Sequence, residues 1–247
     1  MRLPVVSRLA KFGRSPRTVP VHDAYELWAP TYPPVAHNPL MRTEQEVFET
    51  LLRGLHVRRA LDVGTGSGRY LPLLAATGAS VVAGVDFSRA MLAQGRARAR
   101  LVCGDARRLP FRRDLFDLVI AALMIGDVDD LSGCVREMAG TLMRGGHLMY
   151  SDFHPSWAFN GWRRTFRTDD GETLAVPYAP HSIDEHLDAI ASAGLQVVAV
   201  REPRLNGDGA DPAVKAFRRK WGNPPVVVIF HAVKEGRFAA GDGSGRR

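Results

Sequence analysis

The stretch "LDVGTGSG", residues 61–68, contains three glycines that alternate with small polar residues and follow a short apolar run. Glycines at a strand-to-helix turn let the backbone approach a ligand closely. A dinucleotide-binding turn, G-x-G-x-x-G, would need a glycine where this chain has Arg69. Asp62 precedes the first glycine and would disfavour a pyrophosphate at the following helix. The stretch therefore predicts a compact ligand with a cationic amino group, and the alternative is a tight turn that binds no ligand.

Short apolar segments alternate with helical patterns along most of the chain. The expected strands are residues 59–64, 80–86, 100–105, 116–123, 146–152, 195–200 and 225–233. Thr43 and Glu46 match a capping box before an amphipathic helix over residues 47–55, and Ser182 with Glu185 match a second one. Strands that alternate with helices predict an α/β fold whose parallel sheet is covered by helices on both faces.

The net charge of +7 raises the question of a nucleic-acid partner. Residues 1–20 carry five basic and no acidic side chains, and residues 234–247 carry four and two. Residues 21–233 are left with 24 of each. The excess charge therefore lies in the two ends, which argues against a protein dedicated to nucleic acid.

Several stretches together resemble the motifs of the class I S-adenosylmethionine (SAM) dependent methyltransferases, in particular the type 11-like members. These stretches are "LDVGTGSG", "DFSRAML", "GDARRLPF" and the run from "FDLVIAAL" to "SDFHP", and the resemblance covers residues 58–155. It implies a Rossmann-like, mostly parallel sheet of seven strands with the last strand antiparallel. It also implies SAM as the cofactor and no metal.

The resemblance assigns cofactor contacts residue by residue. Asp86 would bind both ribose hydroxyls, Phe87 and Met91 would flank the adenine, and Asp105 would accept a hydrogen bond from the adenine amino group. The full implied set is Tyr25, Tyr32, Asp62, Gly64, Thr65, Gly66, Gly68, Asp86, Phe87, Met91, Asp105, Ala106 and Ala122.

The front segment "AYELWAPTYPPVAHNPLM" is rich in aromatic residues. It is similar to the front of the quinone-biosynthetic and malonyl-carrier-protein methyltransferases, in which an aromatic lid folds over SAM. Tyr25 and Tyr32 would then close on the cofactor. The implied organisation is a flexible basic arm (1–20), an N-terminal helical lid (21–57), a SAM-binding methyltransferase domain (58–233) with an insertion (153–180) that covers the substrate, and a disordered tail (234–247).

Three residues are candidates for taking a proton from the methyl acceptor. His154 follows the expected strand 146–152 at its carboxyl end; the alternative is a histidine that bonds only to its own loop. Asp127 follows the strand 116–123, where many relatives have a histidine, and its alternative role is to cap the next helix. His37, in the expected lid, is the third candidate.

The insertion after the fifth expected strand has two interpretations. Its aromatic residues could stack on a planar acceptor, or they could form the small core of a β-hairpin. Its arginines could bind an anionic acceptor or be neutralised by the acidic residues beside them. The residues concerned are Arg163, Arg164, Arg167, Asp169, Asp170 and Glu172.

The leading functional hypothesis is SAM-dependent methyl transfer to a small aromatic or polyketide-like metabolite at oxygen, nitrogen or carbon. The alternatives are an RNA or protein methyltransferase and a SAM-binding protein that transfers no methyl group. No apolar run reaches the roughly 18 residues of a membrane span, and two cysteines without a disulfide pattern fit a cytoplasmic protein. The sequence is compatible with a homodimer, because an aromatic N-terminal lid can be shared between subunits.

Overall fold

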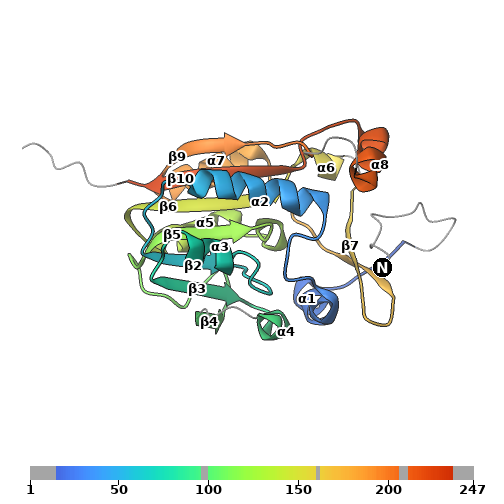
Figure 1. Cartoon of the computed structure of the whole chain (residues 1–247), viewed down its shortest axis with the longest axis horizontal. Coiled ribbons are helices and arrows are strands. Elements are labelled where there is room, and N and C mark those ends of the chain that lie inside the picture. Colours follow the sequence, from blue (N-terminus) through green and yellow to red (C-terminus); the bar gives the residue numbers. More distant parts are fainter. Residues whose placement is uncertain (1–14, 96–99, 160–161, 206–210, 236–247) are drawn as a thin grey trace, which may run out of the picture.

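The computed structural model describes residues 15–95, 100–159, 162–205 and 211–235. Its central sheet has seven strands in the order β4-β3-β2-β5-β6-β10-β9 (Figure 1). The strands are β2 (Arg59–Val63), β3 (Val81–Asp86), β4 (Arg100–Cys103), β5 (Phe116–Ala122), β6 (Leu142–Phe153), β9 (Leu195–Arg201) and β10 (Val227–Lys234). Strands β4, β3, β2, β5 and β6 pair in parallel, whereas β10 is antiparallel to both of its neighbours. The expected α/β fold with an antiparallel last strand is confirmed.

Helices cover both faces of this sheet (Figure 1). Side chains of α2 (Pro39–Leu52), α3 (Leu71–Ala76) and α8 (Pro212–Trp221) join one buried cluster, and those of α5 (Leu131–Thr141) and α7 (Ile183–Ser192) join the other. The short helices α4 (Arg89–Gln94) and α6 (Ser156–Phe159) lie near the strand ends (Figure 1). The expected three-layer arrangement is therefore present.

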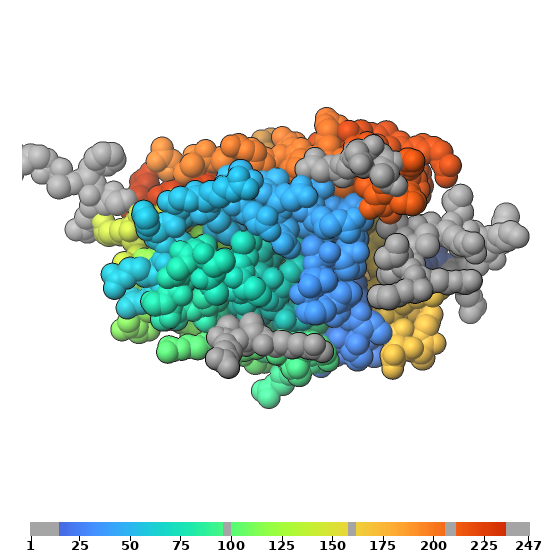
Figure 2. Space-filling model, viewed as in Figure 1, coloured from blue at the N-terminus to red at the C-terminus, as the bar shows by residue number. Residues whose placement is uncertain are grey.

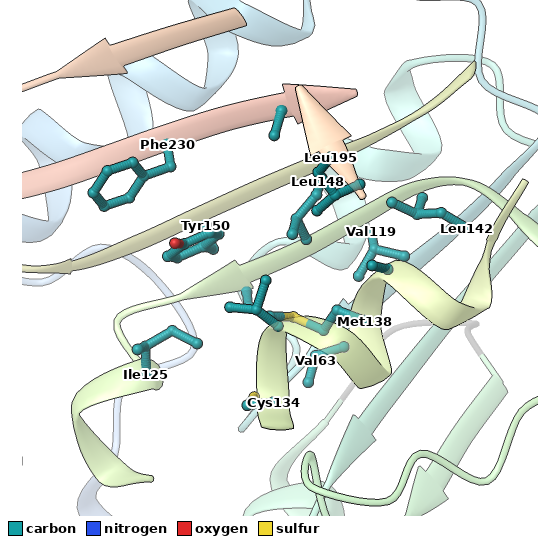
Figure 3. Close-up of a cluster of buried hydrophobic side chains, with 14 of the residues drawn as sticks. Val63, Val119, Ile125, Cys134, Met138, Leu142, Leu148, Tyr150, Leu195 and Phe230 are labelled. Atoms are coloured by element: carbon teal, nitrogen blue, oxygen red, sulfur yellow. The ribbon is translucent and has the colours of Figure 1, made fainter. Parts of the chain in front are cut away.

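The period of two in β10 explains how one strand serves both clusters. Val227 and Ile229 belong to the α2 side, whereas Val228 and Phe230 belong to the α5–α7 side. Figure 3 shows the second cluster, in which Phe230 stacks on Tyr150 of β6 with ring centroids 5.0 Å apart. A strand that is apolar on both faces is buried on both faces, which agrees with the position of β10 between β6 and β9.

The helix α2 begins earlier than the sequence analysis predicted. Asn38 is its N-cap, since its side-chain oxygen accepts a hydrogen bond from the backbone N–H of Met41 at 2.9 Å, and Pro39 occupies the first helical position. The proposed box of Thr43 and Glu46 lies inside the helix, so that assignment was wrong. An Asn-Pro pair is itself a start signal, and it precedes the box by one turn.

A second, three-stranded sheet has the order β1-β8-β7. The insertion supplies the hairpin of β7 (Arg164–Arg167) and β8 (Thr173–Val176), and β1 (Arg17–Thr18) pairs in parallel with β8. Phe166, Leu174 and Val19 are buried together between this sheet and α1 (Val21–Trp28). The hairpin interpretation of the insertion is confirmed.

The first described residues differ from the flexible arm expected over residues 1–20. Val19 is 4% exposed, and its N–H donates to the carbonyl of Ala175 at 3.1 Å. Residues 15–20 are therefore part of the fold, because a strand pairing and a buried side chain hold them. The remainder of the expected arm, 1–14, lies outside the described residues, as does 236–247 of the expected tail.

The expected lid over residues 21–57 also divides in two. Phe48 and Leu52 of α2 are buried against the sheet, so α2 belongs to the main core. Residues 21–38, hereafter the lid segment, lie beside the hairpin and α4, beyond the carboxyl ends of the strands (Figure 1). In Figure 2 this blue segment fills the surface between the teal half of the sheet and the yellow hairpin.

Candidate functional site

The glycine loop follows β2, which has β3 on one side and β5 on the other, at the point where the strand order reverses. Gly64 has φ +67°, and a Cβ atom there would come within 2.7 Å of the Met124 side chain. Gly66 has φ +54°, with open space where a Cβ would be. Both positions favour glycine. The loop therefore places backbone without side chains at the carboxyl ends of the strands, where ligands of open α/β sheets bind.

Asp62 is buried beneath this loop and keeps one oxygen without a partner. The Thr65 hydroxyl donates to its Oδ2 at 2.7 Å, whereas Oδ1 has no hydrogen-bond partner in the structure. Burial raises the pKa of Asp62 to about 7, against the opposing effects of the Thr65 hydrogen bond and the Arg69 charge. A buried carboxylate oxygen without a donor suits a cationic amino group.

Asp86, the last residue of β3, joins the loop to the next helix. Its Oδ2 accepts a hydrogen bond from the Gly66 N–H at 2.7 Å, and its Oδ1 accepts one from the Ser88 N–H at 2.9 Å. Burial raises the pKa of this carboxyl group. Each oxygen retains a lone pair, which is what recognition of two neighbouring hydroxyls requires. Binding of the ribose by Asp86 stays a prediction.

The other implied contacts lie around the same edge of the sheet. Phe87 meets Tyr25 edge-to-face with ring centroids 5.8 Å apart, and Met91 is fully buried in α4. Asp105 is half-exposed and forms an ion pair with Arg107 at 2.6 Å, and this hydrogen bond lowers the pKa of its carboxyl group. An adenine amino group at Asp105 would have to share the carboxylate with Arg107. Ala106 packs on one core cluster and Ala122 on the other.

Aromatic side chains connect the lid segment to the hairpin. Tyr25 stacks on Trp28 with ring centroids 6.0 Å apart, and Trp28 contacts both Tyr32 at 4.9 Å and Phe166 of β7 at 5.0 Å. Burial raises the pKa of both tyrosine hydroxyls. Tyr25 and Tyr32 therefore belong to one aromatic group at this edge of the sheet, and their contact with the cofactor stays a prediction.

Asp127 lies at the centre of this group and caps no helix. The cap of α5 is Asp130, whose side chain accepts from the Gly133 N–H at 2.8 Å. Asp127 accepts a hydrogen bond from the Tyr25 hydroxyl at 2.7 Å and forms a buried ion pair with Arg164 of β7. The helix-cap alternative is wrong for Asp127, and its role as a base stays a prediction.

The two histidine candidates lie in different surroundings. His154 places Nδ1 2.8 Å from the Ser156 hydroxyl and Nε2 2.9 Å from the Glu202 carboxylate, so that both ring nitrogens have partners. His37 meets Tyr32 edge-to-face at 6.0 Å, and partial burial lowers its pKa. His37 is thus beside the lid aromatics, whereas the contacts of His154 are with α6 and the residue after β9.

A buried polar network that was not predicted from the sequence lies behind the glycine loop. Arg69 forms an ion pair with the fully buried Glu44 at 2.7 Å, and Glu44 also accepts a hydrogen bond from Ser151. Glu44 occurs at helical spacing between Met41 and Phe48 on the apolar face of α2. A charged residue in an apolar stripe was the signal that could have identified it.

Comparison with known proteins agrees with this geometry. A family model described as a methyltransferase domain matches residues 61–150. A demethylmenaquinone methyltransferase of Mycolicibacterium paratuberculosis is 40% identical over 191 residues, which cover 71% of this chain and 79% of the relative. The chain belongs to the SAM-dependent methyltransferase family. Its cofactor is SAM, and the unpartnered Asp62 oxygen below the bare glycine loop fits the amino group of that molecule.

Other matches are shorter or more distant. A malonyl-acyl-carrier-protein O-methyltransferase of Halorhodospira halophila is 35% identical over 124 residues, which cover 45% of this chain and 42% of the relative. The chain spans 41% or 42% of the length of several other curated demethylmenaquinone methyltransferases. The crystal structure of a SAM-dependent methyltransferase from Mesorhizobium loti superposes with a TM-score of 0.64 at 21% identity, covering 77% of this chain and 97% of that one. This structural likeness supports the fold.

Two further structural findings concern membranes and metal ions. Within the described ranges, no helix is long and apolar enough to cross a membrane. The same residues include no group of three or more His, Cys, Asp or Glu side chains placed to hold a metal ion.

Proposed function

We propose that this chain transfers a methyl group from SAM to a small, planar, partly aromatic acceptor. The observation that carries the proposal is the set of aromatic side chains that surrounds the carboxyl ends of the strands. Tyr25, Trp28 and Tyr32 come from the lid segment. Phe153, Trp162 and Tyr178 come from the end of β6 and the insertion, with ring centroids 4.7 to 6.0 Å apart. Faces and edges of aromatic rings are the surfaces that a planar apolar acceptor contacts best.

The residues of the chain would act by binding the cofactor and enclosing the acceptor. When bound, SAM supplies a methyl group already activated by a positively charged sulfur. Asp62 would hold the cofactor's amino group and Asp86 its two hydroxyls. The lid segment and the hairpin would exclude water and place the acceptor in line with the methyl carbon, which is the main source of acceleration in such a transfer.

Two features favour a small molecule over RNA or protein. Residues 21–233 carry as many acidic as basic side chains, and the buried Arg164 is paired with Asp127. Among the relatives, one is named a demethylmenaquinone methyltransferase and another a malonyl-acyl-carrier-protein O-methyltransferase. A quinone-like acceptor agrees with the aromatic surroundings.

Both cysteines are free thiols, which supports the proposed location in a reducing compartment, the cytoplasm.

Incubation with isotopically labelled SAM tests the proposal. Separate pools would contain hydroquinones and phenols, 1,3-dicarbonyl compounds, RNA, and protein, with mass spectrometry to detect a gain of one CH₂ unit. We expect label in the first or second pool. Label in RNA or protein would favour the alternative methyltransferases, and SAM binding without transfer to any pool would indicate a protein that only binds the cofactor.

A further inference from the structure

Glu44 is a fully buried carboxylate in an apolar stripe. It lies on α2, and Met41, Phe48 and Leu52 share its buried face. A charge in this position costs free energy unless it is paired and hydrogen-bonded. Replacing a buried ion pair by apolar residues is often neutral or stabilising. Stability alone therefore gives little reason for a glutamate here, and its partners suggest another.

One carboxylate oxygen of Glu44 holds the end of the glycine loop. Its Oε2 accepts a hydrogen bond from Arg69 Nη2 at 2.7 Å, and the Arg69 side chain is 9% exposed. The guanidinium carbon lies 4.3 Å from the centroid of the Tyr70 ring. Arg69 directly follows Gly68, the third glycine of the loop. The ion pair therefore fixes the loop to α2.

The other oxygen holds the end of β5. Oε1 accepts a hydrogen bond from the Ser151 hydroxyl, and the same hydroxyl accepts one from the Leu123 N–H at 2.9 Å. Leu123 has φ +54°, a left-handed conformation that is unfavourable for leucine and persists only where the surroundings impose it. The next residue, Met124, lies against Gly64.

These contacts converge on the two walls of the cofactor site. One wall is the glycine loop above Asp62, and the other is the backbone after β5, which meets the loop where Met124 lies against Gly64. We propose that Glu44 is a positioning residue for the cofactor: it acts through Arg69 and Ser151 to keep these two walls at a fixed separation. Glu44 itself is fully buried behind them.

The test uses the full chain with SAM and S-adenosylhomocysteine as probes. Glu44→Gln keeps the shape of the side chain and removes its charge, and Ser151→Ala breaks only the connection to Leu123. Glu46→Gln, the same substitution at an exposed position of α2, is the matched control. We expect Glu44→Gln and Ser151→Ala each to lower the affinity for both probes by about tenfold in calorimetry, because the separation of the two walls is then no longer fixed. The affinity of the double variant for the probes should be little lower than that of the single variant with the lower affinity, because both changes break one network.

A second measurement separates positioning from stability. Burial is the main cause of the raised pKa of Asp62; the Thr65 hydrogen bond and the Arg69 charge lower this pKa, and the negative charges of Asp86 and Glu44 add to the rise. Glu44→Gln should therefore move the pH midpoint of SAM binding downward, and Glu46→Gln should not. If Glu44→Gln lowers the melting temperature but leaves both the SAM affinity and its pH midpoint unchanged, Glu44 is structural and the proposal is wrong. Should Glu44→Gln fail to fold, unchanged SAM affinity in folded Ser151→Ala would overturn the proposal equally. Wild-type SAM binding and methyl transfer are measured separately, so failure here leaves the proposed function standing.

Discussion

The hydroxyl of Tyr25 donates a hydrogen bond to Oδ2 of Asp127 at 2.7 Å and so joins two segments that are 102 positions apart in the chain. Tyr25 belongs to the lid segment, and Asp127 follows β5, the strand beside the glycine loop. Arg164 of the hairpin binds the same carboxylate. The lid segment and the hairpin are therefore held together at one buried acid.

Tyr25→Phe isolates the hydrogen bond from the ring contacts. The phenylalanine ring keeps the contacts with Trp28 and Phe87, and the bond to a charged acceptor is worth about 1.5–3 kcal/mol. We expect SAM to bind more weakly by about that free energy in calorimetry, with the fold intact. Leu27→Ala on the same helix, where the side chain is 45% exposed, should leave the affinity unchanged. An unaltered dissociation constant in Tyr25→Phe would show that the lid segment closes without this bond.

The contributions of Asp127 and Arg164 to the free energy of unfolding should be coupled, because the two side chains form one buried ion pair. Asp127→Asn leaves the guanidinium buried without a counter-charge, and breaking such a pair costs about 3–5 kcal/mol. Asp127→Asn combined with Arg164→Gln removes both charges, and we expect urea denaturation to show a smaller loss than the sum of the two single losses. Additive losses would mean that the two side chains contribute independently.

The raised pKa of Asp62 predicts how SAM binding depends on pH. Its pKa of about 7 means that the carboxyl group is mostly protonated below neutral pH and charged above it. A cationic amino group prefers the charged form, so the affinity for SAM should rise as the pH increases from 6 to 8, by up to about tenfold per pH unit on the acidic side. The ligand-free protein should show the opposite trend in stability: its free energy of unfolding should fall as the pH rises from about 4, where an unfolded aspartate loses its proton, to about 7, where Asp62 loses its own in the folded state, and should level off above that.

Asp62→Asn is the control for this prediction, since it keeps the shape of the side chain and removes the titration. Calorimetry across this pH range should then show weaker binding with a flattened pH profile. A pH dependence that survives in Asp62→Asn would have to come from another group, and Asp86, a buried acid bonded to the same glycine loop, is the first candidate.

The strands and the glycine loop were predictable from the sequence because their signals are local. Apolar runs marked all seven strands of the main sheet, and Asp62 and Asp86 were placed from their position at or next to the end of a strand. The contacts that complete the site are between distant segments. Neither Tyr25 nor Arg164 has a sequence neighbour that indicates Asp127 as its partner, so neither periodicity nor spacing could predict that contact.

Residues 15–20, which are part of the fold, give a further prediction. A variant that begins at Ser15 keeps β1 and Val19, whereas one that begins at Val21 loses both. Burial of a valine side chain is worth about 1.5–3 kcal/mol, and the pairing of β1 with β8 is lost in addition. We expect a lower free energy of unfolding for the shorter variant than for the one that begins at Ser15. Equal stability would mean that the β1 pairing contributes nothing measurable.

The last prediction concerns the proton of the methyl acceptor. If His154 is the base, one of its ring nitrogens must first leave its partner, which is Ser156 for Nδ1 and Glu202 for Nε2. His154→Ala should then lower the turnover of labelled SAM by a factor of roughly 10²–10⁴ and leave the affinity for SAM unchanged. Glu202→Gln distinguishes this from a structural role, because it removes only the acid that holds Nε2 and should change the rate without changing the melting temperature. His37→Ala and Asp127→Asn are the next variants, and His37 comes first because it contacts Tyr32 of the lid segment. Near-full turnover in all three would mean that the acceptor arrives without a proton to lose and that the chain supplies orientation alone.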